Sequence, residues 1–199
     1  MLAVTPAGPG AEPAGQVPQW LFAFDAAGMA TFRALAMLCA HPHARARATE
    51  EVAAALGERR YLRACLLDTL RLWPTTPAIL RITTRETQWA TERGVATMKA
   101  GTGVLILAPF FHRDRERLAQ ADRFLPEAWL ESDPPDAGFV PFSAGPARCP
   151  GREVVLTVGS AMLSALLPET RGVEGARLVE GDALPALLDP FGLRFRVGN

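Results

Sequence analysis

The 199-residue chain has few cysteines and histidines, and it carries no net charge. Its three cysteines lie far apart, with no C-x-x-C pair and no even number that would suggest a disulfide framework. We therefore expect a reducing, cytoplasmic environment. The 21 basic side chains are balanced by 21 acidic ones, and this balance argues against an electrostatic nucleic-acid binder.

Uninterrupted apolar stretches long enough to cross a bilayer are also missing. Asp25 and Arg33 break the first apolar run, and a later run over 154–167 is too short. The first residues lack the basic flank of a secretory signal. We expect no membrane span in this chain. Hydrophobic residues make up 49% of the sequence, which is enough for one domain with a core.

The order of segments predicts a mainly α fold with a small β-sheet. Residues 1–18 are rich in proline and glycine and predict a flexible tail, followed by one domain over 19–199. Helices are expected over 19–39, 42–56, 59–72 and 152–167. Strand-like runs cover 78–83, 87–89 and 104–108, and a pair of strand-like segments closes the chain.

The segment 142–151 carries the strongest chemical signal. It places Cys149 in a loop of glycine and proline just before a predicted helix, where the helix dipole and free N–H groups favour the thiolate form. Gly145 permits a tight turn, Gly151 lets the backbone approach a flat ligand, and Phe142 offers an aromatic face to the sulfur. A thiolate in such a loop is one of the few protein ligands that hold haem iron. Taken alone, a lone cysteine is more often an inert small hydrophobe.

This segment resembles the haem-binding loop of cytochrome P450 enzymes, Phe-x-x-Gly-x-Arg-x-Cys-x-Gly. The resemblance covers about residues 16–199 and implies the C-terminal half of a P450 fold of the bacterial soluble type. It implies haem b as cofactor, with Cys149 as the axial ligand of the iron. The family's propionate-binding arginine would stand at Ala147, and Arg148 is a displaced substitute. Arg81, in the first strand, is the other arginine that the resemblance assigns to a haem propionate.

A second segment, 27–31, resembles the family's Ala/Gly-Gly-x-Asp/Glu-Thr motif on the oxygen-binding side of the haem. The resemblance implies that Gly28 leaves room for a diatomic ligand and that Thr31 orders water for proton delivery. Ala30 stands where the family has an acid, so the usual acid–alcohol relay is incomplete. The alternative is a glycine and a threonine packed in a helix, with the threonine bonded back to the preceding turn.

Structural motifs of the same family follow. Asp68 and Arg71 are three residues apart and can pair, and they resemble the family's Glu-x-x-Arg. An exposed surface pair is the alternative, and either role is structural. The segment 124–129 resembles Phe-x-Pro-Glu-Arg-Phe with Ala128 in place of the arginine, so we expect a weakened network. His112 replaces the asparagine of an Asn-Arg-Asp-Pro corner, and we interpret it as bracing this turn rather than as an iron ligand.

The resemblance leaves two functions open. The first is a monooxygenase that inserts one oxygen atom from O₂ into a small organic substrate, with electrons from NAD(P)H through a ferredoxin or flavin reductase. The second is a non-catalytic haem-binding remnant that acts through protein contacts. A peroxide-driven haem-thiolate protein lies between the two. Because complete enzymes of the family are longer, we interpret the chain as a fragment.

Overall fold

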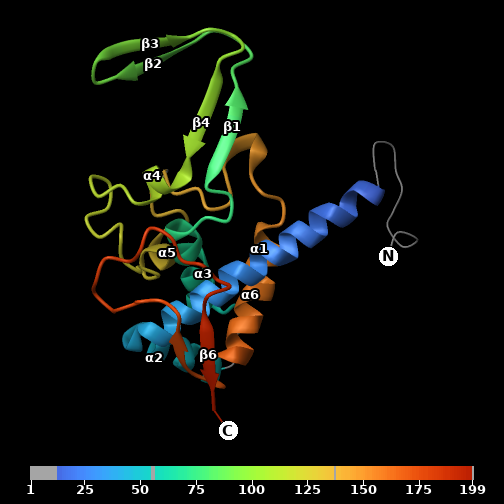
Figure 1. Cartoon of the computed structure of the whole chain (residues 1–199), viewed down its shortest axis with the longest axis vertical. Coiled ribbons are helices and arrows are strands. Elements are labelled where there is room, and N and C mark those ends of the chain that lie inside the picture. Colours follow the sequence, from blue (N-terminus) through green and yellow to red (C-terminus); the bar gives the residue numbers. More distant parts are fainter. Residues whose placement is uncertain (1–12, 55–56, 137, 199) are drawn as a thin grey trace.

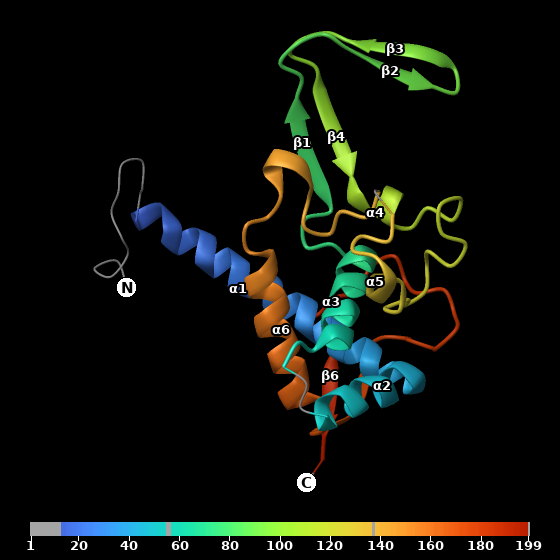
Figure 2. The same cartoon turned by 180° about the vertical axis from the view of Figure 1, so that it is seen from behind.

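The computed structural model of the chain describes residues 13–54, 57–136 and 138–198 (Figure 1). Helices gather in one half of the molecule, and a two-stranded arm extends from that half with a hairpin at its far end (Figures 1 and 2). The fold is mainly helical with small two-stranded sheets, so the predicted fold class is confirmed.

Four helices form the helical half, namely α1 (Pro13–Ala40), α2 (Pro42–Ala53), α3 (Arg60–Leu72) and α6 (Arg152–Leu166). Helix α1 runs diagonally through the molecule, and both α3 and α6 pack against it (Figure 1). Their facing sides are apolar, and the buried side chains include Leu35, Leu38, Leu62, Leu66, Leu156 and Leu163. The short helices α4 (Ala108–His112) and α5 (Ala128–Glu131) lie in the connection that leads to the cysteine loop.

Helix α1 begins at Pro13, so the prediction of a flexible tail is wrong for residues 13–18, while residues 1–12 lie outside the described residues. A proline at the start of a helix loses no hydrogen bond, because the first N–H groups have no partner inside the helix. The N-terminal half of α1 extends away from the rest of the chain (Figure 1). Its apolar side chains are accordingly exposed, at 66% for Leu21, 62% for Phe22 and 60% for Phe24.

The expectation that no segment could span a bilayer is not supported by α1. The stretch Val17–Ala40 is long and apolar enough to cross a membrane, with a mean hydropathy of 1.4, although it contains Asp25 and Arg33. Two charges in 24 residues do not lower the hydropathy enough to exclude a span. A helix buried in a protein core passes the same test, and 44% of the most apolar window in this stretch is buried.

Each sheet is an antiparallel pair of strands. The first pairs β1 (Ala78–Ile82) with β4 (Gly103–Leu107), the second β2 (Thr87–Thr91) with β3 (Gly94–Met98), and the third β5 (Thr170–Glu174) with β6 (Arg194–Val197). Strand β3 was not predicted. It begins at Gly94, directly after a two-residue turn, and the φ of 112° at this position suits glycine. Its five residues are too few for a clear alternating pattern.

The β1–β4 strand pair presents one face to the cysteine loop. In β1, Ile79 and Arg81 point to the same side because side chains alternate along a strand, and both line a cavity with the loop. Leu80 and Ile82 point to the other side and are 75% and 72% exposed. The loop before α6 passes beside β1 in both views (Figures 1 and 2). The strand pair and α6 therefore place residues from distant parts of the sequence around Cys149.

Candidate functional site

Cys149 is an exposed free thiol at the end of a tight loop. Its N–H donates a hydrogen bond of 2.8 Å to the Phe142 carbonyl, which closes the loop over 142–149. The Ser143 N–H donates to the Val140 carbonyl at 2.9 Å, which forms the turn at the loop entrance. Helix α6 begins three residues after Cys149, as the sequence predicts. The thiol is thus held on a hydrogen-bonded loop at a helix N-terminus.

The other two cysteines have a different environment. Cys65 is fully buried in α3, and burial raises the pKa of its thiol well above the ordinary value. Burial also raises the pKa of the half-buried Cys39 thiol, although Arg45 next to it acts in the opposite direction. Both therefore favour the neutral thiol, which is a poor metal ligand. Cys149 is the one cysteine that is open to a ligand.

The Cys149 side chain opens into a cavity of about 330 Å³, which we call the thiol cavity. Its walls come from the middle of α1, the end of α3 and the turn after it, strand β1, the start of α4, the cysteine loop and the first turn of α6. Most lining residues are apolar, and they include Phe22, Ala26, Ala27, Leu70, Ile79, Pro141, Phe142 and Val155. This volume lies within the range of small-molecule sites, and such walls suit an apolar or flat aromatic ligand.

Two glycines shape the loop around the sulfur. Gly145 has φ of 63°, a left-handed conformation that favours glycine, and the predicted tight turn is confirmed. Gly151 has an ordinary backbone, with φ of −81°. A Cβ at Gly151 would meet only the Cys149 Sγ, at 3.7 Å, so its absence leaves the space beside the sulfur open. Ser143 also has a left-handed φ, of 61°, which is unusual for a residue with a side chain.

The two arginines predicted to contact propionates lie on different sides of the loop. Arg81 lines the thiol cavity from β1 and is exposed, and its Nη1 donates to the carbonyl of Leu80 at 2.8 Å. Its guanidinium is therefore available to a carboxylate at the rim of this cavity. Arg148 is exposed and lines a second hollow of about 250 Å³, together with Gly145 and Arg152. The structure brings Arg81, but not Arg148, into the cavity of Cys149.

The predicted oxygen-side residues lie next to the thiol cavity but do not line it. Thr31 is 1% exposed, and its hydroxyl donates to the Ala27 carbonyl at 2.8 Å. The same hydroxyl faces α6, where a Cβ added at Gly159 would come within 3.2 Å of it. Gly28 faces open space, since a Cβ there would meet nothing within 4 Å. Helix α1 instead contributes Ala26 and Ala27 to the cavity wall, and sequence reasoning did not single out Ala26.

Asp68 and Arg71 form the predicted ion pair, and both side chains are 1% exposed. The pair is therefore buried, which excludes the alternative of an exposed surface pair. Arg71 donates to Asp68 through Nε at 2.6 Å and through Nη2 at 3.2 Å. The remaining guanidinium hydrogens go to the carbonyls of residues 112, 121 and 123. Arg71 thus ties α3 to the long connection that leads to the cysteine loop.

Ala128 was expected to weaken this network, and the structure shows which donors the Asp68 carboxylate keeps without an arginine there. Asp68 accepts two further hydrogen bonds, from the Leu125 N–H at 2.6 Å and from the Trp129 indole N–H at 3.0 Å. The indole of Trp129, directly after Ala128, donates a hydrogen bond to the Asp68 carboxylate. Both carboxylate oxygens therefore have hydrogen-bond donors although the arginine is missing. The signal that sequence reasoning missed is Trp129 itself, since a buried indole N–H usually finds an acceptor.

His112 braces the connection, as predicted, and the structure shows how. Its ring is fully buried and lies between the Arg71 carbonyl and the Val140 N–H, at 3.0 and 2.9 Å. Burial lowers the pKa of His112 to about 4, and the positive charge of Arg71 acts in the same direction. The ring is therefore neutral at physiological pH and lies outside the thiol cavity.

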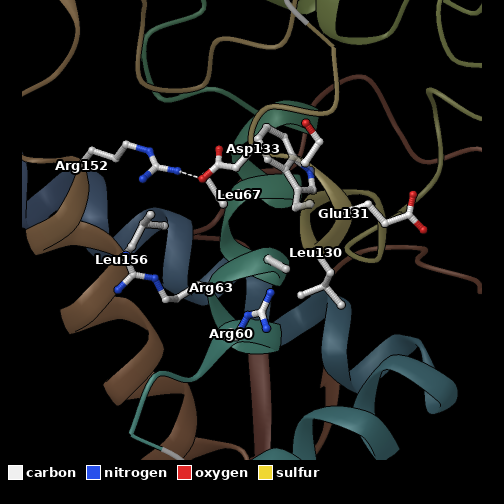
Figure 3. Close-up of a pocket in the computed structure, with 11 residues that line it drawn as sticks. Arg60, Arg63, Leu67, Leu130, Glu131, Asp133, Arg152 and Leu156 are labelled. Atoms are coloured by element: carbon white, nitrogen blue, oxygen red, sulfur yellow. Dashed lines mark hydrogen bonds and ion pairs between the residues drawn. The ribbon is translucent and has the colours of Figure 1, made fainter.

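A further hollow of about 280 Å³ lies between α3, α5 and α6, away from the cysteine (Figure 3). Its charged side chains largely neutralise one another, since Arg152 pairs with Asp133 inside the hollow (Figure 3). Arg63 pairs with Glu153, which lies outside the lining of the hollow. Among the described residues, no group of three or more His, Cys, Asp or Glu side chains could hold a metal ion.

Comparison with known proteins identifies the family. The family described as "Cytochrome P450" matches residues 22–168. The chain is 28% identical over 159 residues to probable cytochrome P450 4d20 of Drosophila melanogaster, covering 72% of this chain and 30% of the relative. It is 33% identical over 144 residues to the cytochrome P450 monooxygenase FCK2 of Fusarium pseudograminearum, and this match covers 69% of this chain and 25% of the relative. It is 34% identical over 117 residues to cytochrome P450 52A4 of Candida maltosa, and this match covers 55% of this chain and 22% of the relative.

These relatives come from a fly and from fungi, and they give no support to the expected bacterial type. The chain spans between a fifth and a third of their length. The family match covers the cysteine loop, the buried Asp68–Arg71 pair and most of α1. From this match and this geometry, the chain belongs to the cytochrome P450 family.

Proposed function

We propose that this chain carries the haem-thiolate part of a monooxygenase, with Cys149 as the axial ligand of the haem iron. The observation that carries the proposal is the position of this thiol, which is exposed, set on a closed loop before α6, and open to a cavity with apolar walls. Haem b, when bound, would supply the activation of O₂ for insertion of one oxygen atom into a small organic substrate. Electrons would come from NAD(P)H through a ferredoxin or flavin reductase.

The residues around the sulfur fit this group. The missing Cβ of Gly151 leaves space beside the thiol, and Phe142 supplies an aromatic wall on the same cavity. Arg81 presents a guanidinium at the cavity, where it would hold a propionate carboxylate. Gly145 allows the turn that aims Cys149 outward. For Arg148, which lies over the second hollow, a propionate contact stays a prediction that would require its side chain to move.

The oxygen side of the site is the second part of the proposal. Ala26 and Ala27 leave room above the thiol because their side chains are small. Thr31 and Gly28 continue this side of α1, and we propose that Thr31 orders the water that delivers protons. In the structure the Thr31 hydroxyl is bonded to the Ala27 carbonyl, so this role requires the hydroxyl to exchange that bond for water. With Ala30 in place of an acid, we expect proton delivery to be slow.

We also propose that the chain corresponds to the C-terminal half of the family fold. The order of elements supports this, because α1, α2, α3, strands β1–β4, the cysteine loop and α6 follow one another as the resemblance implies. Because the chain spans only 22–30% of the three relatives, the activity of a whole P450 is a proposal for it. The cytoplasmic location is likewise a proposal, which rests on the unpaired cysteines.

A second candidate is a haem-binding protein without monooxygenase activity. The observations that favour it are Ala30 and Ala128, which stand where the family has an acid and an arginine, so the ligand loop is kept without the full set of surrounding residues. Between the two lies a peroxide-driven protein that keeps the thiolate loop and needs no electron donor.

One experiment separates these functions. The full chain is reconstituted with haem and given a panel of small apolar substrates with either NAD(P)H and a reductase system under ¹⁸O₂, or hydrogen peroxide. The monooxygenase proposal predicts one ¹⁸O atom in the product of the first reaction. Product from peroxide alone indicates the peroxide-driven protein, and haem binding without product indicates the remnant. If no haem binds through Cys149, all three are refuted.

A further inference from the structure

The His112 ring occupies a position where both of its nitrogens meet main-chain groups. It belongs to the last residue of α4 and is fully buried, and it packs edge-to-face with the ring of Phe139. The Val140 N–H can only donate, so Nε2 of His112 must accept this bond of 2.9 Å. Nδ1 then carries the proton and donates to the Arg71 carbonyl at 3.0 Å. The contacts therefore fix both the charge and the tautomer of the ring.

These two bonds continue as a chain of contacts to the thiol. Val140 lies at the entrance of the cysteine loop, and its carbonyl accepts the Ser143 N–H. Phe142, two residues after Val140, accepts the Cys149 N–H at 2.8 Å. At the other end, Arg71 holds residue 112 a second time, through a 2.9 Å bond from Nη1 to the His112 carbonyl. The buried Asp68–Arg71 pair is thus linked through one imidazole to the segment that carries Cys149.

We infer that His112 is a positioning residue for Cys149, and that it acts by holding the Val140 N–H against α3. Without this acceptor, the Val140 N–H would be left without a partner at the entrance of the loop, and the loop would gain freedom at its first turn. His112 touches neither the thiol nor the thiol cavity, so it acts only through the loop. The effect of His112 on haem binding rests on the proposed function. The effect of His112 on the order of the cysteine loop does not, because it follows from the two ring hydrogen bonds alone.

Three variants at one position separate the two ring bonds. His112→Asn keeps an amide N–H where Nδ1 lies, so it can bond the Arg71 carbonyl, but it is too short to accept from Val140. His112→Gln places a carbonyl oxygen near the position of Nε2 and keeps the Val140 bond. His112→Phe keeps the ring shape and loses both bonds. A matched control is Thr69→Val, which removes a buried hydrogen bond of 2.7 Å within α3 that is not part of this chain of contacts.

The readout is amide hydrogen exchange over the segment 138–151 in the full chain, measured by mass spectrometry at low protein concentration. Since one hydrogen bond contributes about 1 kcal/mol, we expect exchange of the Ser143 and Cys149 amides to rise about fivefold or more in His112→Asn and His112→Phe. His112→Gln should stay near the wild type. Thr69→Val should change this segment no more than it changes the rest of the chain.

The outcomes decide the inference without haem. Unchanged exchange of the Cys149 amide in His112→Asn would overturn it, and so would an equal rise in His112→Gln or Thr69→Val, because either result would assign His112 a general role in stability. A haem titration with the same variants is the second measurement. If even the wild type shows no thiolate spectrum, the proposed function fails, while the exchange data still decide whether His112 positions the loop. If haem binds, the Asn and Phe variants should lose it faster than the Gln variant.

Discussion

The buried ion pair of α3 allows a prediction whose size follows from its contacts. Asp68→Asn keeps the shape of the side chain but removes the charge that balances Arg71, and both groups are 1% exposed. Asp68 accepts four hydrogen bonds, two from Arg71 and one each from the Leu125 N–H and the Trp129 indole. An asparagine offers one oxygen, and its NH₂ would face N–H donors, so some of these bonds must be lost.

Breaking a buried pair of this kind costs about 3–5 kcal/mol, because a buried charge is left without a partner. Domains of this size have total stabilities of about 5–15 kcal/mol, so Asp68→Asn should remove a large part of the free energy of unfolding. Trp129→Phe, which removes one donor to a charged acceptor, should cost about 1.5–3 kcal/mol. The control is Arg47→Gln at the exposed pair with Glu127, where the two side chains are 50% and 55% exposed. There we expect a loss below about 1 kcal/mol.

Urea unfolding followed by circular dichroism measures these differences, with the slope m compared between variants to ensure a common unfolding transition. A loss below about 1 kcal/mol for Asp68→Asn would refute the reasoning, since it would mean that Arg71 finds full compensation elsewhere. A loss in Arg47→Gln equal to that in Asp68→Asn would show that burial does not govern the cost.

Three further predictions concern a histidine, a strained turn and the oxygen side. The pKa of His112 is lowered from 6.5 to about 4 in the folded chain, so its contribution is complete above pH 6.5 and is lost as pH falls through 4. The difference in unfolding free energy between wild type and His112→Gln should fall by about 3 kcal/mol between pH 7 and pH 4, and a constant difference would contradict this. Ser143→Gly should raise the free energy of unfolding by about 0.5–1 kcal/mol, because φ of 61° disfavours a residue with a Cβ, and a lower melting temperature would argue against this strain. Ala30→Asp should improve the coupling of NAD(P)H consumption to product but cost about 1–3 kcal/mol of stability, because Ala30 is 1% exposed. Unchanged coupling would refute the relay argument.

Local sequence patterns predicted the elements that depend on local signals. Helix α6 and the Gly145 turn were predicted because a long apolar segment follows a loop rich in glycine and proline, and the structure confirms both. The Asp68–Arg71 pair was predicted because two side chains that are three residues apart on a helix lie on the same face. Each of these features needs only the residues within a few positions of it.

The features that the sequence did not predict depend on distant contacts. Trp129 reaches Asp68 across 61 residues of sequence, and His112 reaches Val140 across 28. No local pattern shows that an indole takes the place of an arginine. The side of the loop on which Arg148 lies, and the burial of Thr31 against α6, also depend on packing between elements. The start of α1 was missed because proline and glycine predict a loop, whereas Pro13 can begin a helix.

The central claim is that Cys149 is the axial ligand of a haem iron. The most direct test reconstitutes the full chain with haem, reduces it, adds carbon monoxide, and compares the absorption spectrum with that of Cys149→Ser. The account predicts the red-shifted Soret band of thiolate ligation in the wild type and its loss in Cys149→Ser. Cys39→Ser, which changes a half-buried thiol outside the thiol cavity, should keep the band. A red-shifted band that persists in Cys149→Ser, or a wild type that binds haem without this band, would contradict the account.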